Sequence, residues 1–149
     1  MNRNRLLLTL LTLPMLTLGF WLGRMSHSQI EPSAEASAQK RVFEIRTYTT
    51  LEGKLDALHA RFRNHTTKLF EKHGMTNIGY WSPQDAPLSQ NTLVYIIAHP
   101  SREAAQKNWE AFRSDPEWLK ARDASEANGK IVSKVESVFV NATDYSPLK

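Results

Sequence analysis

Cysteine is absent from the 149 residues of this sequence, which excludes disulfide bonds, a thiol nucleophile and a thiolate metal site. The sequence also lacks a glycine-rich phosphate loop, a serine nucleophile elbow and a paired-carboxylate signature. Each of these motifs would identify a class of enzyme from a short stretch of sequence. Their absence favours a non-catalytic protein, and the question of catalysis stays open at this stage.

A large excess of one charge is also missing. The formal charge of the whole sequence is +4, but four of its basic residues precede Arg41. From Arg41 onward, 15 lysines and arginines are interspersed with 13 aspartates and glutamates. A nucleic-acid-binding surface needs a basic stripe or patch, so we do not expect nucleic acid as a partner.

One long hydrophobic run occurs, and it lies near the N-terminus. Residues 1–5 contain two arginines, and residues 6–23 (LLLTLLTLPMLTLGFWLG) contain no charged side chain. A basic start followed by an apolar run is typical of an export signal, which predicts a periplasmic or otherwise extracytoplasmic protein. We therefore interpret residues 1–24 as a signal peptide or a signal anchor.

The two interpretations of this leader differ in where the protein ends up. Arg24 favours a retained transmembrane helix over residues 6–23, anchored in the inner membrane, whereas Pro14 weakens that helix. Ser26 and Ser28 offer small residues for cleavage, after which the protein would be secreted. Residues 25–40 are rich in serine, alanine, glutamine and glutamate and are predicted to be a flexible linker. The folded domain is expected over residues 41–149.

The domain alternates between strand and helix patterns. β-branched and aromatic residues dominate four short segments, which predicts strands over residues 41–50, 75–81, 92–99 and 131–140. Apolar residues recur at helical spacing over residues 54–73, and two further helices are predicted after Ser101 and after Asp115. The order βαββαβ predicts an α+β domain of ferredoxin-like type, with an antiparallel four-stranded sheet and helices on one face.

Helices on one face leave the other face of the predicted sheet uncovered. By strand parity we assign six residues of the first and third strands to this open face: Glu44, Arg46, Tyr48, Tyr95, Ile97 and His99. This set is too apolar for a wetted surface and too polar for a dry core. We therefore expect a homodimer whose two sheets enclose a cavity.

Several short stretches of the domain form a recognisable set. They are Phe43-Glu44-Ile45-Arg46-Thr47-Tyr48, Lys72-His73-Gly74-Met75, Gly79-Tyr80-Trp81, Asp115-Pro116-Glu117-Trp118 and Asp144-Tyr145-Ser146-Pro147. With them, residues 42–147 resemble the NIPSNAP family. The resemblance implies a dimeric α+β barrel, in which two ferredoxin-like sheets face each other. It implies no catalytic mechanism, although similar folds include cofactor-free monooxygenases, isomerases and haem-binding proteins.

The leading functional hypothesis is an exported or membrane-tethered homodimer that binds a small hydrophobic or anionic ligand between its sheets. The candidate ligand-binding residues are Glu44, Arg46, Tyr48, Tyr95 and His99. In this hypothesis Arg46 holds an anionic group of the ligand, Glu44 orients Arg46, and Tyr48 donates a hydrogen bond. A structural alternative is an internal Glu44–Arg46 ion pair that fixes the geometry of the sheet.

The alternative function is an enzyme of the cofactor-free monooxygenase or isomerase type, with His99, Arg46 and Tyr48 as candidate catalytic residues. No cofactor is predicted, but His99 ends a strand near the expected cavity mouth, so haem binding is a third hypothesis. An ordinary strand-end role is the simpler explanation of a lone histidine beside Pro100.

No metal site is predicted. His59, His65 and His73 fall on one expected helix, but no two of them are three or four residues apart. The three tryptophans of the domain are interpreted as core residues, because tryptophan supplies a large buried area in a small domain.

Overall fold

The computed structural model describes residues 41–149, and the expected leader (1–24) and linker (25–40) lie outside this range. The described elements are β1 (Val42–Thr50), α1 (Leu55–Arg61), the π-helical turn η1 (Phe62–Thr66), α2 (Thr67–Lys72), β2 (Thr76–Trp81), the 3₁₀ turn η2 (Leu88–Gln90), β3 (Thr92–His99), α3 (Arg102–Ser114), α4 (Pro116–Ser125) and β4 (Val132–Asn141). None of the helices in residues 41–149 is long and apolar enough to cross a membrane.

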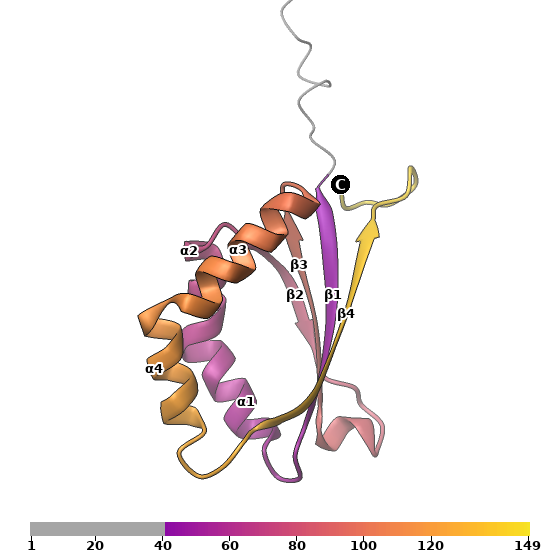
Figure 1. Ribbon diagram of the computed structural model, residues 1–149. Coiled ribbons are helices and arrows are strands. Elements are labelled where there is room, and N and C mark those ends of the chain that lie inside the picture. Colours follow the sequence, from indigo (N-terminus) through magenta and orange to yellow (C-terminus); the bar gives the residue numbers. More distant parts are fainter. Residues whose placement is uncertain (1–40) are drawn as a thin grey trace, which may run out of the picture.

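The four strands form one antiparallel sheet in the order β2-β3-β1-β4. Helices α1 to α4 all lie on one side of this sheet (Figure 1). The predicted α+β fold with an antiparallel four-stranded sheet is confirmed, and each strand begins and ends within one residue of its predicted bounds. The strands could be predicted because β-branched and aromatic residues are concentrated in these four segments.

The predicted helix over residues 54–73 is continuous but changes its winding in the middle. α1 runs into the π-helical turn η1 and then into α2. At this turn the hydroxyls of Thr66 and Thr67 donate to the carbonyls of Arg61 and Phe62, over 3.3 and 3.2 Å. A π-helical turn contains an extra residue and so rotates the helix that follows it. Phe62 before the turn and Phe70 after it are both buried against the sheet.

Side-chain caps set the bounds of α3 and α4. The hydroxyl of Ser101 accepts a hydrogen bond from a backbone N–H of the first turn of α3 (3.1 Å), and Asp115 accepts one from the N–H of Glu117 (2.7 Å). Lys72 and His73 at the end of α2 also contact the Asp115 carboxylate, at 2.9 and 2.7 Å. These contacts hold the pKa of Asp115 well below its ordinary value, Lys72 having the larger effect. Asp115 therefore joins the end of α2 to the junction of α3 and α4.

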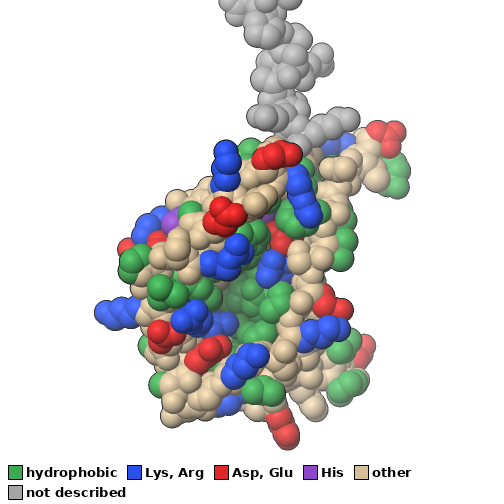
Figure 2. Space-filling model, viewed as in Figure 1, with side chains coloured by type: hydrophobic (Ala, Val, Ile, Leu, Met, Phe, Trp, Pro, Cys, Tyr) green, Lys and Arg blue, Asp and Glu red, His purple; other side chains and the backbone are tan. Residues whose placement is uncertain are grey.

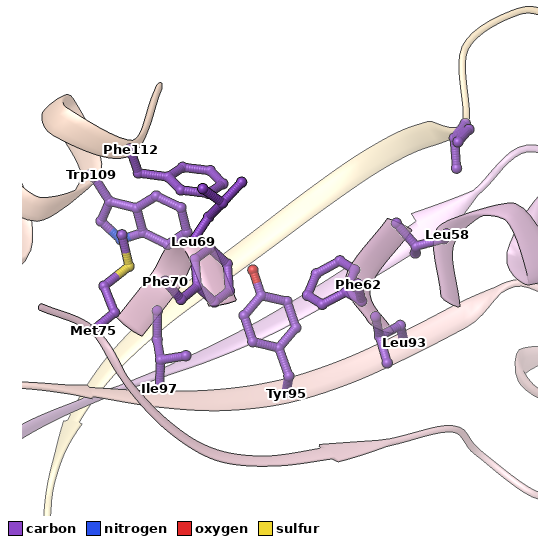
Figure 3. Close-up of a cluster of buried hydrophobic side chains, with 11 residues drawn as sticks. Leu58, Phe62, Leu69, Phe70, Met75, Leu93, Tyr95, Ile97, Trp109 and Phe112 are labelled. Atoms are coloured by element: carbon purple, nitrogen blue, oxygen red, sulfur yellow. The ribbon is translucent and has the colours of Figure 1, made fainter. Parts of the chain in front are cut away.

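The core lies between the sheet and the helices and is rich in aromatic rings (Figure 3). The centroids of Phe62 and Tyr95 are 5.1 Å apart, and those of Phe70 and Phe112 are 5.0 Å apart. In Figure 3, Tyr95 rises from β3 toward the helices, with its hydroxyl directed into the helix layer. The buried cluster comprises Leu58, Phe62, Leu69, Phe70, Met75, Leu93, Tyr95, Ile97, Trp109, Phe112 and Ile131.

The assignment of faces from strand parity was wrong. The six residues assigned to the open face lie under the helices instead: Glu44, Arg46, Tyr48, Tyr95, Ile97 and His99. For example, Tyr48 packs against Phe62 of η1, and Trp109 of α3 donates a hydrogen bond to Glu44. Alternation separates the two faces of a strand, but both faces of this sheet carry apolar residues. The pattern alone therefore could not indicate which face the helices cover.

The face that the helices leave uncovered is apolar. Ile45, Val94 and Ile96 lie on it, and the edge strands add Trp81 and Val138, which are 50% and 58% exposed. Trp81 is thus not a core residue, contrary to the prediction. Contiguous exposed apolar area of this kind is uncommon on a protein that stays alone in water.

Candidate functional site

A row of polar side chains crosses the helix-facing side of the sheet. Tyr80 of β2 lies opposite Tyr95 of β3, Tyr95 lies opposite Arg46 of β1, and Arg46 lies opposite Ser137 of β4. Residues directly opposite one another on antiparallel strands place their side chains on the same face. The row therefore brings Arg46 and Tyr95, two of the predicted ligand-binding residues, together. Glu44 lies two residues from Arg46 along β1, on the same face of the sheet.

Glu44 is the best-enclosed carboxylate of the site, with 1% exposure. Its Oε1 accepts hydrogen bonds from Arg46 Nη1 (2.6 Å) and Ser137 Oγ (2.6 Å). Its Oε2 accepts from Trp109 Nε1 (2.7 Å) and lies 3.1 Å from His99 Nε2. The four partners come from β1, β4, α3 and β3, so this single side chain ties the sheet to the helix layer.

These partners keep Glu44 ionised. Burial by itself would raise the pKa of Glu44, because a carboxylate loses its hydration in the interior. The hydrogen bonds from His99, Ser137, Trp109 and Arg46 outweigh burial and lower the pKa of Glu44 from 4.5 to about 2. A carboxylate with every lone-pair direction occupied is a poor proton acceptor, so the geometry favours a positioning role for Glu44.

Arg46 is held by Glu44 on one side and by an aromatic ring on the other. The guanidinium carbon lies 4.3 Å from the centroid of the Trp109 ring, a cation–π contact, and Nη1 donates to Glu44. The Nε atom of Arg46 is buried and has no hydrogen-bond partner. The side chain as a whole is 15% exposed, so part of the guanidinium reaches the surface.

Tyr95 places a second unpaired polar atom beside Arg46. Its hydroxyl is fully buried and has no hydrogen-bond partner, and its ring packs against that of Tyr48 with centroids 5.3 Å apart. Burial raises the pKa of Tyr95 well above its ordinary value, and the nearby Tyr48 side chain raises it further by a smaller amount. At neutral pH this hydroxyl is therefore protonated and can donate.

A groove opens between α3 and β4 beside this cluster. Its volume is about 350 Å³, and its walls include Gln106, Trp109 and Arg113 of α3 and Phe139 of β4. The guanidinium of Arg102 lies over the Phe139 ring at 3.4 Å, at the boundary with a second hollow of about 520 Å³ along β4. Figure 2 shows the molecule hollowed between the helices and β4, with hydrophobic side chains in the hollow and lysines and arginines around it. We refer to this feature as the α3–β4 groove.

His99 does not lie at a cavity mouth, as the sequence led us to expect. Its side chain is 0% exposed, its Nε2 faces Glu44, and its Nδ1 is buried without a partner. Neither ring nitrogen is open to a substrate proton or to a haem iron in this arrangement. The residues of the described part of the chain also contain no cluster of three side chains that could hold a metal ion.

The structure brings all five predicted ligand-binding residues to the helix-facing side of the sheet, and it adds residues that the sequence analysis missed. Trp109 was interpreted only as a core residue, and Ser137 was not singled out. Parity in the last strand would have placed Ser137 on the same face as Arg46 if the pairing of β1 with β4 had been known. The sequence offered no signal for Arg113, because a single arginine on a helix is commonplace.

The comparisons with known proteins agree with this fold. The sequence pattern of the NIPSNAP family matches residues 43–147. A crystal structure of a NIPSNAP family protein with unknown function from Agrobacterium tumefaciens str. C58 is similar with a TM-score of 0.64; it is 21% identical, and the match covers 75% of this chain and 96% of that one. None of the curated proteins matches.

Two further solved structures share the fold. An uncharacterised NIPSNAP-like domain protein from Burkholderia xenovorans has a TM-score of 0.63 at 16% identity, covering 73% of this chain and 90% of that one. A second NIPSNAP family protein from Agrobacterium tumefaciens str. C58 has a TM-score of 0.63 at 19% identity, covering 73% and 99%. The family match spans most of the chain and nearly the whole described domain, and the resemblance noted from the sequence is confirmed: this chain belongs to the NIPSNAP family.

Proposed function

We propose that this chain is a small-molecule-binding protein whose ligand lies in the α3–β4 groove. One observation carries the proposal: Trp109 lines the groove, and its ring stacks on Arg46, whose side chain is 15% exposed and whose Nε has no hydrogen-bond partner. Ligand sites are typically apolar hollows with a few converging polar groups, and this arrangement has that form.

Binding explains the site better than catalysis does. The two oxygens of Glu44 are occupied by four partners, and both nitrogens of His99 are enclosed. A general base must reach the proton that it removes, and neither side chain faces the groove in a way that allows this.

We further propose that the chain is a homodimer that pairs through the uncovered face of its sheet. The support is the apolar character of that face, which carries Ile45, Ile96, Val138 and Trp81; the polar residues from which the sequence predicted a dimer lie on the opposite face. Burying such a face against a second copy removes apolar area from water. The ligand groove lies on the opposite side of the sheet and stays accessible in this dimer.

Export stays a proposal that rests on the sequence of residues 1–24, which lie outside the described range. Fractionation of cells that express the full chain tests it. We expect the protein in the membrane fraction if residues 6–23 form an anchor, and in the periplasmic fraction without residues 1–28 if the leader is cleaved after Ser28. Full-length protein in the cytoplasmic fraction would rule out both forms.

A pair of neighbouring substitutions tests the groove. Gln106→Trp places a large side chain on the groove wall, whereas Lys107→Trp adds the same side chain to the exposed surface of α3 outside the lining. With the neutral fluorescent probe N-phenyl-1-naphthylamine, we expect Gln106→Trp to weaken binding about tenfold or more and Lys107→Trp to leave it unchanged. Equal probe affinity in both variants and the wild type would refute a groove site.

A second pair tests the dimer. Val138 lies on the uncovered face of β4, and Val135, which is 44% exposed, lies on the helix-facing side of the same strand. A carboxylate buried in an apolar interface is strongly unfavourable, so Val138→Glu should give a monomer in sedimentation analysis while Val135→Glu stays dimeric. A wild-type protein that is monomeric at micromolar concentration would exclude the dimer.

A further inference from the structure

We propose that the ligand of the α3–β4 groove is an organic carboxylate with a flat apolar body, and that its carboxylate pairs with the free edge of Arg46. This inference rests on the proposed binding function and specifies the chemical class of the ligand. It is carried by the hydrogen-bonding state of Arg46 and Tyr95 and by the composition of the groove wall.

The guanidinium of Arg46 presents an unused fork. Its Nη1 donates to Glu44, its Nε is buried without a partner, and its Nη2 makes no hydrogen bond to any residue between 41 and 149. Nε and Nη2 lie along one edge of the planar guanidinium, and their N–H groups point in the same direction. This edge matches the two oxygens of a carboxylate, which it can bind through two parallel hydrogen bonds.

The hydroxyl of Tyr95 supplies a third unused donor. Arg46 and Tyr95 are direct cross-strand neighbours on the helix-facing side of the sheet, and the hydroxyl is completely buried without a partner. A buried hydroxyl that makes no hydrogen bond is unfavourable by about 1–3 kcal/mol, so an unpaired one is unusual unless something else satisfies it. An anionic oxygen between Arg46 and Tyr95 would satisfy both side chains at once.

The groove wall indicates what the rest of the ligand is like. The rings of Trp109, from α3, and Phe139, from β4, both form part of the groove wall. Rings in such a position favour a flat apolar or aromatic body, because they offer area for stacking but few hydrogen bonds. The groove volume of about 350 Å³ is at the lower end of the range for small-molecule sites.

The charges around the groove favour an anion and limit it to one negative charge at its inner end. Glu44 already neutralises part of Arg46, so a second buried anion needs further positive charge nearby. Arg102 and Arg113 provide this charge on the groove wall, against a single acidic residue, Glu103. A dianionic group such as a phosphate ester would face one buried guanidinium that is already shared with Glu44, which is why we favour the carboxylate.

The test compares two acids with one alcohol on the full chain. Benzoate and 2-naphthoate are the carboxylate probes, and 2-naphthylmethanol is the neutral control of matching shape. By calorimetric titration at neutral pH we expect 2-naphthoate to bind about 10- to 100-fold more tightly than 2-naphthylmethanol, as expected for a paired, charge-assisted contact. Benzoate should bind more weakly than 2-naphthoate because it buries less apolar area.

Two variants locate the carboxylate without removing the buried charge or the core ring. Tyr95→Phe deletes only the unpaired hydroxyl, and Arg46→Lys keeps the positive charge but removes the planar fork. We expect each variant to bind 2-naphthoate about tenfold more weakly than the wild type does, and to lower the preference for 2-naphthoate over 2-naphthylmethanol by about fivefold or more. Arg63→Lys, an exposed substitution of the same type on η1, should change neither affinity.

The outcomes separate this inference from the proposed function. Equal affinity of the wild type for 2-naphthoate and 2-naphthylmethanol, with both lost in Gln106→Trp, would keep the groove as a binding site and overturn the carboxylate. Unchanged 2-naphthoate affinity in both Tyr95→Phe and Arg46→Lys would also overturn it. Binding of all three probes that Gln106→Trp does not weaken would overturn the groove itself, and no binding of either acid would overturn the ligand class.

Discussion

The indole Nε1 of Trp109 donates to Oε2 of Glu44 over 2.7 Å, which joins helix α3 to the central strand β1 although the two residues are 65 positions apart. This bond fixes the orientation of Trp109, which lines the groove, relative to that of Glu44, which positions Arg46. A change at either side chain is therefore expected to affect both the stability of the domain and the orientation of the Arg46 guanidinium.

Trp109→Phe should reveal the contribution of this hydrogen bond. The substitution keeps an aromatic ring in the core but leaves one oxygen of the buried carboxylate with a donor fewer. A hydrogen bond to a charged group contributes about 1.5–3 kcal/mol, so we expect a loss of at least that size in the free energy of unfolding, measured with urea. Trp118→Phe, at a partly buried tryptophan that does not contact Glu44, serves as the control; an equal loss in both variants would contradict the prediction.

The charge of Glu44 should make stability depend on pH in the acid range. The pKa of Glu44 falls from 4.5 to about 2 in the folded protein, because its hydrogen bonds outweigh burial. A lowered folded-state pKa means that the stabilisation is complete above the unfolded value and is lost as the pH falls toward the folded one. We expect Glu44→Gln to be less stable than the wild type by about 3 kcal/mol at neutral pH, since it breaks a buried ion pair.

This difference between wild type and Glu44→Gln should shrink steadily as the pH falls from 4.5 toward 2. Urea unfolding of both proteins across that range, followed by circular dichroism, gives the two curves. A difference that stays constant down to the lowest pH would show that the Glu44 carboxylate does not carry the stabilisation. The substitution Glu52→Gln provides a control, because Glu52 is exposed in the turn between β1 and α1.

The sequence was sufficient to predict the fold and the cluster but not the side of the sheet on which the cluster lies. Strand periodicity and helix caps are local signals, and Ser101 and Asp115 act as the caps they were expected to be. Tyr48, Tyr95 and Ile97 were assigned to the open face by strand parity, but another apolar set alternates with them on the opposite face. Which set the helices cover is decided by their packing, here by contacts such as Tyr48 with Phe62.

The polar contacts of the site could likewise be predicted from the sequence only where the two residues are close in the chain. Glu44 and Arg46 are two residues apart on one strand, so the sequence could predict that they pair. Trp109 and Ser137 reach Glu44 from segments 65 and 93 residues away, and no local pattern encodes that approach. His99 was expected at a cavity mouth because it ends a strand; in fact it is 0% exposed, and its ring lies beside Glu44 and Phe139.

Tyr95→Phe should leave the stability of the domain unchanged or raise it. The Tyr95 hydroxyl is buried and unpaired, so its removal deletes an unsatisfied group and little else. The matched variant is Tyr80→Phe, on the neighbouring strand, because the Tyr80 hydroxyl donates to the side-chain oxygen of Asn77. We expect Tyr80→Phe to lower the free energy of unfolding by about 1 kcal/mol. Urea unfolding that ranks the two variants in the opposite order would show that the Tyr95 hydroxyl has a partner in solution.

Gly79 and Trp81 of β2 lie side by side on the uncovered face of the sheet. A Cβ atom added at Gly79 would lie 2.5 Å from the far end of the Trp81 indole, so Gly79→Ala must move that ring. Because Trp81 is 50% exposed, the ring can turn outward with little effect on the fold. If the uncovered face forms the dimer, the displaced ring should disturb the interface and weaken dimerisation about tenfold or more, measured by sedimentation.

A double-mutant cycle shows whether this effect acts through Trp81. Trp81→Ala removes the ring from the apolar face, and in that background Gly79→Ala has no indole left to displace. We therefore expect Gly79→Ala to weaken the dimer in the wild type and to have no further effect when combined with Trp81→Ala, so that the two changes are not additive. Additive losses would mean that Gly79 affects the dimer through the backbone of β2, and unchanged dimer affinity in both single variants would place the interface on another surface.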